Sequence, residues 1–256
     1  MYDTFSADYD RFVDWQGRLS IELPFILEQL QMVRAKHVLD AACGTGMHAI
    51  ALAKRGYLVA GSDLSNGMIE RAQANAISAN VVVQLEIAGF GTLANTFGKG
   101  NFDALLCLGN SLPHLLTPIA LASALADFAM CLKPGGLLLI QDRNFDSVLT
   151  HHERWMEPQS HQEGNAEWIF QRFYDFDPDG LLTFNIVTLK REGLGSWDQR
   201  IVMSRLRPLL HSELTTALST AGFEAITSYG NMTGAIFDPK SSGNLVLSAR
   251  LPVNSK

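Results

Sequence analysis

The sequence has a shortage of basic residues and no long apolar run. Lys and Arg number 20 against 26 Asp and Glu, which leaves a net charge of −6 at pH 7, so the overall field repels polyanions such as nucleic acids. The longest apolar runs, for example 104–108 and 136–140, have the length of a strand. A helix that spans a bilayer needs roughly 20 apolar residues. We therefore expect no nucleic-acid partner and no membrane partner.

Cysteines and targeting signals are also scarce. Cys43, Cys107 and Cys131 are odd in number and widely spaced, unlike a disulfide framework or a C-x-x-C metal knuckle. Residues 1–10 are acidic and aromatic and lack the basic start and apolar stretch of a secretory signal. These features predict reduced cysteines and a cytoplasmic location. The content of 47% apolar and 18% charged residues is that of a folded globular chain.

Short apolar strands alternate with helical segments over the first half of the chain. Strands are predicted at 37–41, 57–63, 81–87, 102–108 and 137–142, and helices at 21–33, 47–55, 65–77 and 119–132. This alternation is typical of a parallel sheet with helices on both faces. The fourth of these strands is nearly continuous in apolar residues, as expected of a strand buried on both faces.

After residue 144 the pattern changes to that of antiparallel strands. Residues 168–176 and 181–190 flank the turn Asp177-Pro-Asp-Gly180, which predicts a hairpin. Further elements are predicted as a strand at 199–207, a helix at 212–220, a strand from 222 and a strand at 244–251. The predicted fold class is α/β, a doubly wound Rossmann-like sheet of seven strands with an antiparallel β insertion between strands 5 and 6.

The same patterns predict the domain organisation. Residues 1–256 form a single domain, with an N-terminal helical cap at 1–36, a cofactor-binding half at 37–145, an antiparallel insertion at 146–208, and a C-terminal helix with closing strands at 209–256.

A glycine-rich turn, Asp40-Ala-Ala-Cys-Gly-Thr-Gly46, follows the first predicted strand. Glycines at the carboxyl end of a parallel strand allow close approach of a ligand, and nucleotides bind there in such folds. The acid Asp63 ends the second strand and is placed to accept hydrogen bonds from ribose hydroxyls. Asp40 would repel a pyrophosphate but suits the ammonium and sulfonium of S-adenosylmethionine. The alternative is that both acids only cap the helices that follow them.

At these residues the sequence resembles the class I S-adenosylmethionine-dependent methyltransferases. The blocks that carry the resemblance are Val38–Gly46, Gly61–Asp63 and Leu132–Gly136. Two further blocks, Cys107–Leu115 and Asp142–Asp146, are similar to segments of the glycine N-methyltransferase family and its glycine and sarcosine relatives. The resemblance covers most of the first 145 residues and implies S-adenosylmethionine as cofactor and S-adenosylhomocysteine as product.

The resemblance also implies site residues. Arg18 stands at the position of an arginine that meets the cofactor's carboxylate, and Phe90 where the family has an aromatic flanking adenine. Asn110 and Arg143 match the residues that hold the acceptor's carboxylate in the family. The arginine fork suits that task because it binds carboxylates in a bidentate manner. The full set expected to bind the cofactor is Arg18, Asp40, Ala42, Gly44, Gly46, Asp63, Leu64, Met68, Gly89, Phe90 and Leu108.

Each acceptor-binding residue has a structural alternative. Arg143 is close in sequence to Asp142 and Asp146, either of which could pair with it, and Asn110 could simply form a turn after the fourth strand. Asp142 stands where the family usually has histidine and is expected to add a negative charge near the carboxylate site. The family's tyrosines around the amine have no convincing counterparts here, which leaves the acceptor open.

No catalytic group is required by the chemistry beyond correct positioning. His114 is the candidate for a general base, and the alternative is a structural histidine in a Pro-His turn, which we favour. His151, His152 and His161 lack coordinating acids at helical spacing, so we expect a solvated loop and no metal.

We expect an S-adenosylmethionine-dependent enzyme that methylates the amine of a small amino acid such as glycine or sarcosine. Three alternatives stay open: a methyltransferase of this fold acting on another small molecule at nitrogen, oxygen or carbon; a non-catalytic sensor of the cofactor; and a nucleotide-linked oxidoreductase. Related enzymes often form homo-oligomers, but the sequence shows no interface signature.

Overall fold

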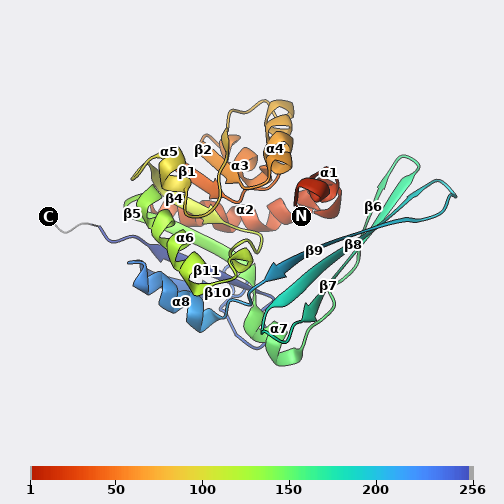
Figure 1. Cartoon of the computed structure of the whole chain (residues 1–256). Helices are drawn as coiled ribbons and strands as arrows, with labels where there is room; N and C mark the ends of the chain where they lie inside the picture. Colours follow the sequence, from red (N-terminus) through yellow and green to blue (C-terminus); the bar gives the residue numbers. More distant parts are fainter. Residues whose placement is uncertain (1, 254–256) are drawn as a thin grey trace.

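The computed structural model describes residues 2–253, which form two β-sheets and their covering helices (Figure 1). The larger sheet consists of β1 (His37–Ala41), β2 (Leu58–Asp63), β3 (Gln84–Ile87), β4 (Phe102–Cys107), β5 (Leu132–Arg143), β10 (Glu224–Tyr229) and β11 (Asn244–Arg250). Its order is β10-β11-β5-β4-β1-β2-β3. Strands β1 to β5 pair in parallel, whereas β11 is antiparallel to both of its neighbours. The predicted seven-stranded fold is confirmed.

Helices cover both faces of this sheet. The helices of the described chain are α1 (Tyr2–Phe12), α2 (Trp15–Met32), α3 (Met47–Ala53), α4 (Asn66–Ser78), α5 (Leu93–Phe97), α6 (Pro118–Cys131), α7 (Phe145–His151) and α8 (His211–Thr220), with a 3-10 turn, η1, at Leu112–His114. Of these, α1 packs on α4 and the insertion, and α7 packs on the insertion. Consecutive residues of β1 serve opposite cores: Val38 packs with α2 and α3, and Leu39 packs with α5, α6 and α8. Burial on both faces explains the nearly continuous apolar sequence of these strands.

The strand order reverses between β1 and β4. The chain runs from β1 outward to β3 on one side and from β4 to β5 on the other. Loops that leave neighbouring strands in opposite directions open a crevice at the carboxyl ends, where ligands bind in folds of this kind. The fold therefore places the loop after β1 and the loop after β4 on either side of one crevice.

The second sheet is the predicted antiparallel insertion, which lies between β5 and β10 in the chain. It contains β6 (Gln159–Glu163), β7 (Ala166–Phe176), β8 (Leu182–Glu192) and β9 (Asp198–Leu206), in that order. Figure 1 shows its long strands extending away from the main sheet. The hairpin turn predicted at 177–180 joins β7 to β8. Strand β6 and helix α7 were not predicted.

Helix α1 connects the insertion to the main sheet. Its Phe5 and Phe12 pack edge-on against Phe170 of β7, with ring centroids 6.2 and 5.5 Å away. On another side Asp10 accepts a hydrogen bond from Arg71 of α4 at 2.9 Å. The sequence indicated only a polar and aromatic lead-in at residues 2–17, so the 11-residue helix α1 was not predicted, and α2 begins at Trp15, before the helix predicted at 21–33. The packing of α1 on distant aromatic rings stabilises a helix whose own sequence is polar.

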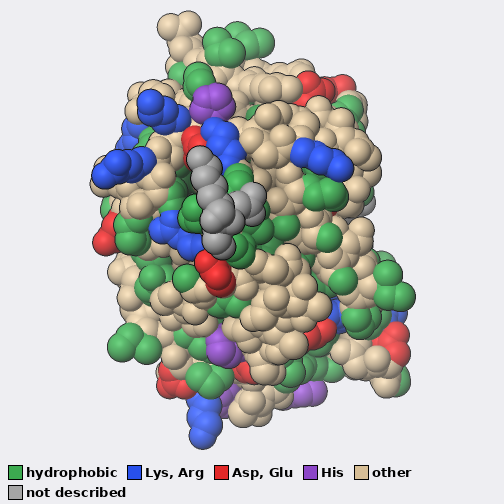
Figure 2. Space-filling view, turned by 90° about the vertical axis from the view of Figure 1, so that its left-hand side faces the viewer, with side chains coloured by type: hydrophobic (Ala, Val, Ile, Leu, Met, Phe, Trp, Pro, Cys, Tyr) green, Lys and Arg blue, Asp and Glu red, His purple; other side chains and the backbone are tan. Residues whose placement is uncertain are grey.

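Within residues 2–253, every helix is too short or too polar to cross a bilayer. On the face shown in Figure 2, the described basic, acidic and apolar side chains are interspersed.

Candidate active site

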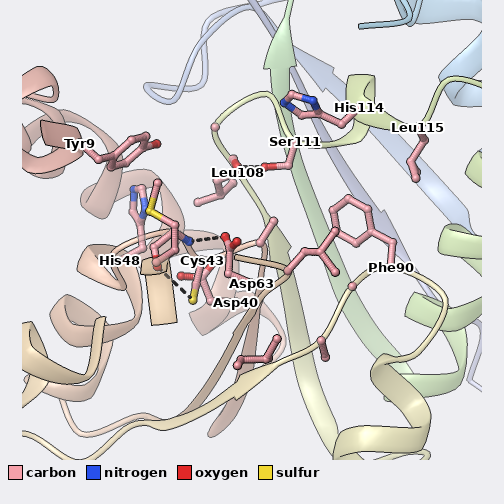
Figure 3. Close-up of a pocket in the computed structure, with 18 of the residues that line it drawn as sticks. Tyr9, Asp40, Cys43, His48, Asp63, Phe90, Leu108, Ser111, His114 and Leu115 are labelled. Carbon is pink, nitrogen blue, oxygen red and sulfur yellow. Dashed lines mark hydrogen bonds between the residues drawn. The ribbon is translucent and has the colours of Figure 1, made fainter. Parts of the chain in front are cut away.

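A cavity of about 660 Å³ lies in the crevice at the carboxyl ends of β1, β2 and β4. Figure 3 shows Asp40 and Asp63 on its strand side, Tyr9 of α1 at one end, and Phe90 and His114 toward the other. A volume of this size suits a nucleoside-type ligand. Ten of the eleven residues expected to bind the cofactor line it: Arg18, Asp40, Ala42, Gly44, Asp63, Leu64, Met68, Gly89, Phe90 and Leu108.

Asp40 presents an uncompensated carboxylate oxygen to this cavity. The side chain is buried, and its Oδ2 has no hydrogen-bond partner among the described residues. Burial raises the pKa of Asp40 from 3.8 to about 6, although the charge of His48 and a backbone hydrogen bond from Ala49 oppose the rise. An orphaned buried acceptor is costly unless a ligand satisfies it. The arrangement is therefore suited to a cationic group.

Asp63 is held by two backbone donors. Its Oδ2 accepts from Gly44 N at 3.0 Å and its Oδ1 from Ser65 N at 2.9 Å. These bonds join the glycine loop to the end of β2. Each carboxylate oxygen has more than one acceptor site, so Asp63 keeps capacity for hydroxyl groups in the cavity.

The two glycines of the loop have different tasks. Gly44 lines the cavity with φ +55°, a conformation that favours glycine. Gly46 does not line it, which departs from the expectation for this residue. A Cβ on Gly46 would lie 3.0 Å from the Cβ of Ala72, so this glycine permits close packing of α3 on α4.

Arg18 lies at the junction of two cavities. Its Nε donates to both carboxylate oxygens of Glu22 at 3.0 Å, and its Nη2 lies 3.5 Å from Gln141 Oε1. Glu22 also binds His48 at 2.6 Å. Although burial opposes ionisation, the hydrogen bond from His48 and the charge of Arg18 keep the pKa of Glu22 low. Glu22 thus orients the Arg18 side chain, which lines both cavities.

A second cavity of about 310 Å³ adjoins the first and shares Tyr9, Arg18, Gly109 and His114 with it. Its walls come from α1 and α2, from the loop after β4, from the ends of β5 and β11, and from β6, β7 and β8 of the insertion. Both residues expected to bind the acceptor, Asn110 and Arg143, line it. The structure therefore brings them together beside the cofactor cavity.

Asn110 and Arg143 are joined through the backbone. Asn110 adopts φ +67°, and its Oδ1 accepts from Arg143 N at 2.9 Å. The Arg143 guanidinium donates from Nη2 to Glu153 at 2.7 Å, while its Nε is buried without a partner in the described chain. The structural alternative supposed an ion pair of Arg143 with Asp142 or Asp146. The acid that Arg143 pairs with is instead Glu153. Asn110 lies in a bend after β4, and it also faces the cavity.

Two nearby titratable groups are neutral at pH 7. Burial lowers the pKa of His114 to about 4, so its imidazole is uncharged where the two cavities meet. Burial raises the pKa of Asp142 to about 8. Its side chain is enclosed, with both oxygens lacking partners among residues 2–253. The protonated form of Asp142 therefore predominates at neutral pH, so the negative charge expected near the carboxylate site is largely suppressed.

Comparison with known proteins gives consistent matches. Residues 38–136 match the family model described as a methyltransferase domain. The chain is 30% identical to the glycine/sarcosine N-methyltransferase of Parasynechococcus marenigrum, over 90% of this chain and 77% of that protein. It is 30% identical to the enzyme of that name from Aphanothece halophytica, over 89% and 81%. The chain belongs to the glycine/sarcosine N-methyltransferase family. It is an S-adenosylmethionine-dependent methyltransferase, as the sequence resemblance implied.

Solved structures support the fold of this family member. An S-adenosylmethionine-dependent methyltransferase from Clostridium acetobutylicum aligns with a TM-score of 0.78 at 17% identity, over 98% of this chain and 99% of that one. An amino pentose methyltransferase from Micromonospora echinaspora, solved with S-adenosylmethionine bound, aligns with a TM-score of 0.70 at 21% identity, over 96% of both chains.

The first cavity fits this cofactor. The buried Asp40 Oδ2 lacks a donor that a cationic group would supply, Asp63 carries acceptor oxygens, and Phe90 provides an aromatic wall that packs on Phe128 at 5.4 Å between centroids. Sequence reasoning missed Trp15 and His48, which also line the cavity. Trp15 is three residues before Arg18 and thus on the same helical face, which was the available signal.

No cluster of three or more His, Cys, Asp or Glu side chains with metal-binding geometry occurs among residues 2–253.

Proposed function

We propose that this methyltransferase transfers a methyl group from S-adenosylmethionine to the amine of a small amino acid of the glycine or sarcosine type. The observation that carries the proposal is the second cavity, where Arg143 and Asn110 face a space that adjoins the cofactor cavity. Guanidinium and amide groups at such a site bind a carboxylate. The names of the similar enzymes point to the same acceptors.

The residues of the first cavity have distinct tasks in this proposal. Asp40 would hold the ammonium group of the cofactor, Arg18 its carboxylate, and Asp63 its ribose hydroxyls, while Met68 and Phe90 would flank the adenine. Ala42, Gly44, Leu64, Gly89 and Leu108 complete the walls. When bound, S-adenosylmethionine supplies an electrophilic methyl group on a positively charged sulfur.

The acceptor amine must attack that methyl group in line with the bond to sulfur. Arg143 and Asn110 anchor the carboxylate at one end of the acceptor, so the amine is held at the shared boundary of the cavities. Such positioning can supply roughly 7–11 kcal/mol of the barrier reduction. Helix α1 covers the crevice through Tyr9, and this restricts access of water.

The amine must lose a proton before it attacks. His114 faces both cavities, but a pKa near 4 makes it a weak base. We therefore assign His114 to the lining of the boundary and assign no general base. The amine then enters as the free base, and the proton is released to solvent.

The substitution Arg143→Ala tests the acceptor assignment. We expect the KM for glycine or sarcosine to rise by about 10- to 100-fold, as for loss of a charged hydrogen-bonding partner, while the KM for S-adenosylmethionine changes little. Steady-state formation of S-adenosylhomocysteine measures both constants. Equal increases in both constants would contradict the carboxylate assignment.

The cytoplasmic location, the homo-oligomeric state and the domain boundaries stay predictions from the sequence. Fractionation of cells and light scattering of the purified chain test the first two.

A further inference from the structure

A second guanidinium lines the acceptor cavity. Arg172 of β7 lines it from the insertion, whereas Arg143 lines it from the end of β5 in the main sheet. Its guanidinium carbon lies 4.8 Å from the centre of the Phe12 ring. The Nε is buried without a hydrogen-bond partner, and Arg172 has no ion pair among residues 2–253. A half-buried arginine with no acid is unusual and requires an explanation.

The guanidinium groups of Arg143 and Arg172 line the same cavity and act on each other electrostatically. Burial lowers the pKa of Arg172, and the positive charge of Arg143 lowers it further. Tyr174 lies near both: burial raises its pKa to about 12, and the charges of Arg143 and Arg172 oppose that rise. The phenol is therefore protonated at neutral pH and can donate a hydrogen bond in the same cavity.

The charges of the cavity leave one positive charge uncompensated. Its charged lining residues are Arg18, Glu22, Arg143 and Arg172. Arg18 pairs with Glu22, and Arg143 pairs with Glu153, which does not line the cavity. Arg172 remains. An amino acid whose amine is a free base carries one negative charge, on its carboxylate, and would balance it.

We propose that Arg172 is a second acceptor-binding residue, which grips the carboxylate of the amino acid together with Arg143. This inference rests on the proposed function and extends it from one side of the cavity to the other. Two arginines on separate sheets then clamp one carboxylate, so the insertion selects the acceptor as well as covering it. The requirement for both favours carboxylate acceptors over amines of equal size.

The competing explanation is that Arg172 only anchors α1 through its contact with Phe12. Arg154 is a matched control, because its guanidinium also stacks on aromatic rings of the insertion, 5.0 Å from Trp155 and 5.3 Å from Phe173. Arg154 pairs with Asp175 outside the cavity. A general loss of stacking would affect both variants alike.

The first experiment compares Arg172→Gln, Arg172→Lys and Arg154→Gln in steady-state assays with glycine and sarcosine. We expect Arg172→Gln to raise the acceptor KM by about 10- to 100-fold and the S-adenosylmethionine KM by less than about threefold. Arg172→Lys should recover part of the loss, because it keeps the charge but not the fork. An unchanged acceptor KM, or equal changes in Arg154→Gln, would overturn the inference.

A second measurement does not depend on turnover. Acetate serves as a minimal carboxylate probe, with S-adenosylhomocysteine present and chloride at equal ionic strength as control. We expect acetate to raise the melting temperature of the wild type and of Arg154→Gln but much less that of Arg172→Gln and of Arg143→Gln. Loss of the effect in Arg143→Gln alone would overturn the role of Arg172 and leave the proposed function intact. Acetate binding without turnover of any amino acid would contradict the proposed function while supporting the clamp.

Discussion

Replacing Asp40 by asparagine should weaken cofactor binding without weakening the fold. The variant removes the carboxylate whose buried Oδ2 lacks a partner in the described chain. Loss of a hydrogen bond between a charged pair costs about 1.5–3 kcal/mol, which corresponds to about 10- to 150-fold lower affinity for S-adenosylmethionine. Isothermal titration calorimetry with the cofactor and with S-adenosylhomocysteine measures this change.

The same substitution should not lower the stability of the unliganded protein. The pKa of the Asp40 carboxyl rises from 3.8 to about 6 on folding. The free energy of unfolding therefore falls by about 3 kcal/mol as the pH rises through that interval. The stability is complete below pH 3.8 and is lost above about pH 6. The asparagine of the variant cannot ionise, but its buried amide costs about 1–3 kcal/mol without partners. We therefore expect equal or higher stability of Asp40→Asn at pH 7.5, measured by urea unfolding.

Asp103 provides a matched control for this prediction. Its Oδ2 accepts from the backbone N–H groups of Lys36 and His37, and its Oδ1 accepts from Lys133 Nζ at 2.6 Å. Although burial opposes ionisation, these bonds hold its pKa below the usual value. Asp103→Asn should lower stability and leave cofactor affinity unchanged. Full cofactor affinity of Asp40→Asn, or destabilisation of its unliganded form like that of Asp103→Asn, would contradict the prediction.

Three further predictions concern the structure around the site. Asp10→Ala removes the acceptor of Thr45 Oγ1 and Arg71 Nε, so α1 should become more accessible to protease and the KM for S-adenosylmethionine should rise by about 10-fold; unchanged proteolysis would contradict this. The wild type should lose about 1.4 kcal/mol of stability per pH unit as the pH rises toward about 8, and Asp142→Asn should lose less. An equal shift of the urea midpoint between pH 5.5 and 7.5 in both proteins would contradict this. Gly46→Ala, at φ +77°, should cost about 1–3 kcal/mol of stability, and an unchanged urea midpoint would refute the packing role.

The sequence predicted the parts of the fold whose signals are local. The strand and glycine turn at 37–46 and the Ser65 N-cap, which accepts from Met68 N at 3.2 Å, form as their residue types indicate. Helix α5 was missed because its cap comes from elsewhere: Leu93 N and Ala94 N donate to Asp127, more than 30 residues away. A cap supplied by a distant residue leaves no local pattern.

The second cavity shows the same limit. Asn110 and Arg143 were identified by family resemblance, since an arginine near two acids has a simpler explanation as an ion pair. In the structure neither of those acids pairs with Arg143. Asp142 is enclosed by the sheet, and Asp146 accepts from His211 N at 2.9 Å. Arg172 carried no signal, because only the packing of the insertion against the main sheet brings it to the cavity.

The most direct test of the central claim is an acceptor panel assayed for S-adenosylhomocysteine, with methylated products identified by mass spectrometry. The panel contains glycine, sarcosine, dimethylglycine and carboxylate-free amines of similar size, each compared with a reaction lacking acceptor. The account predicts turnover confined to the amino acids, with glycine or sarcosine among the substrates. Turnover of the carboxylate-free amines at comparable kcat/KM would contradict the acceptor site built by Asn110 and Arg143.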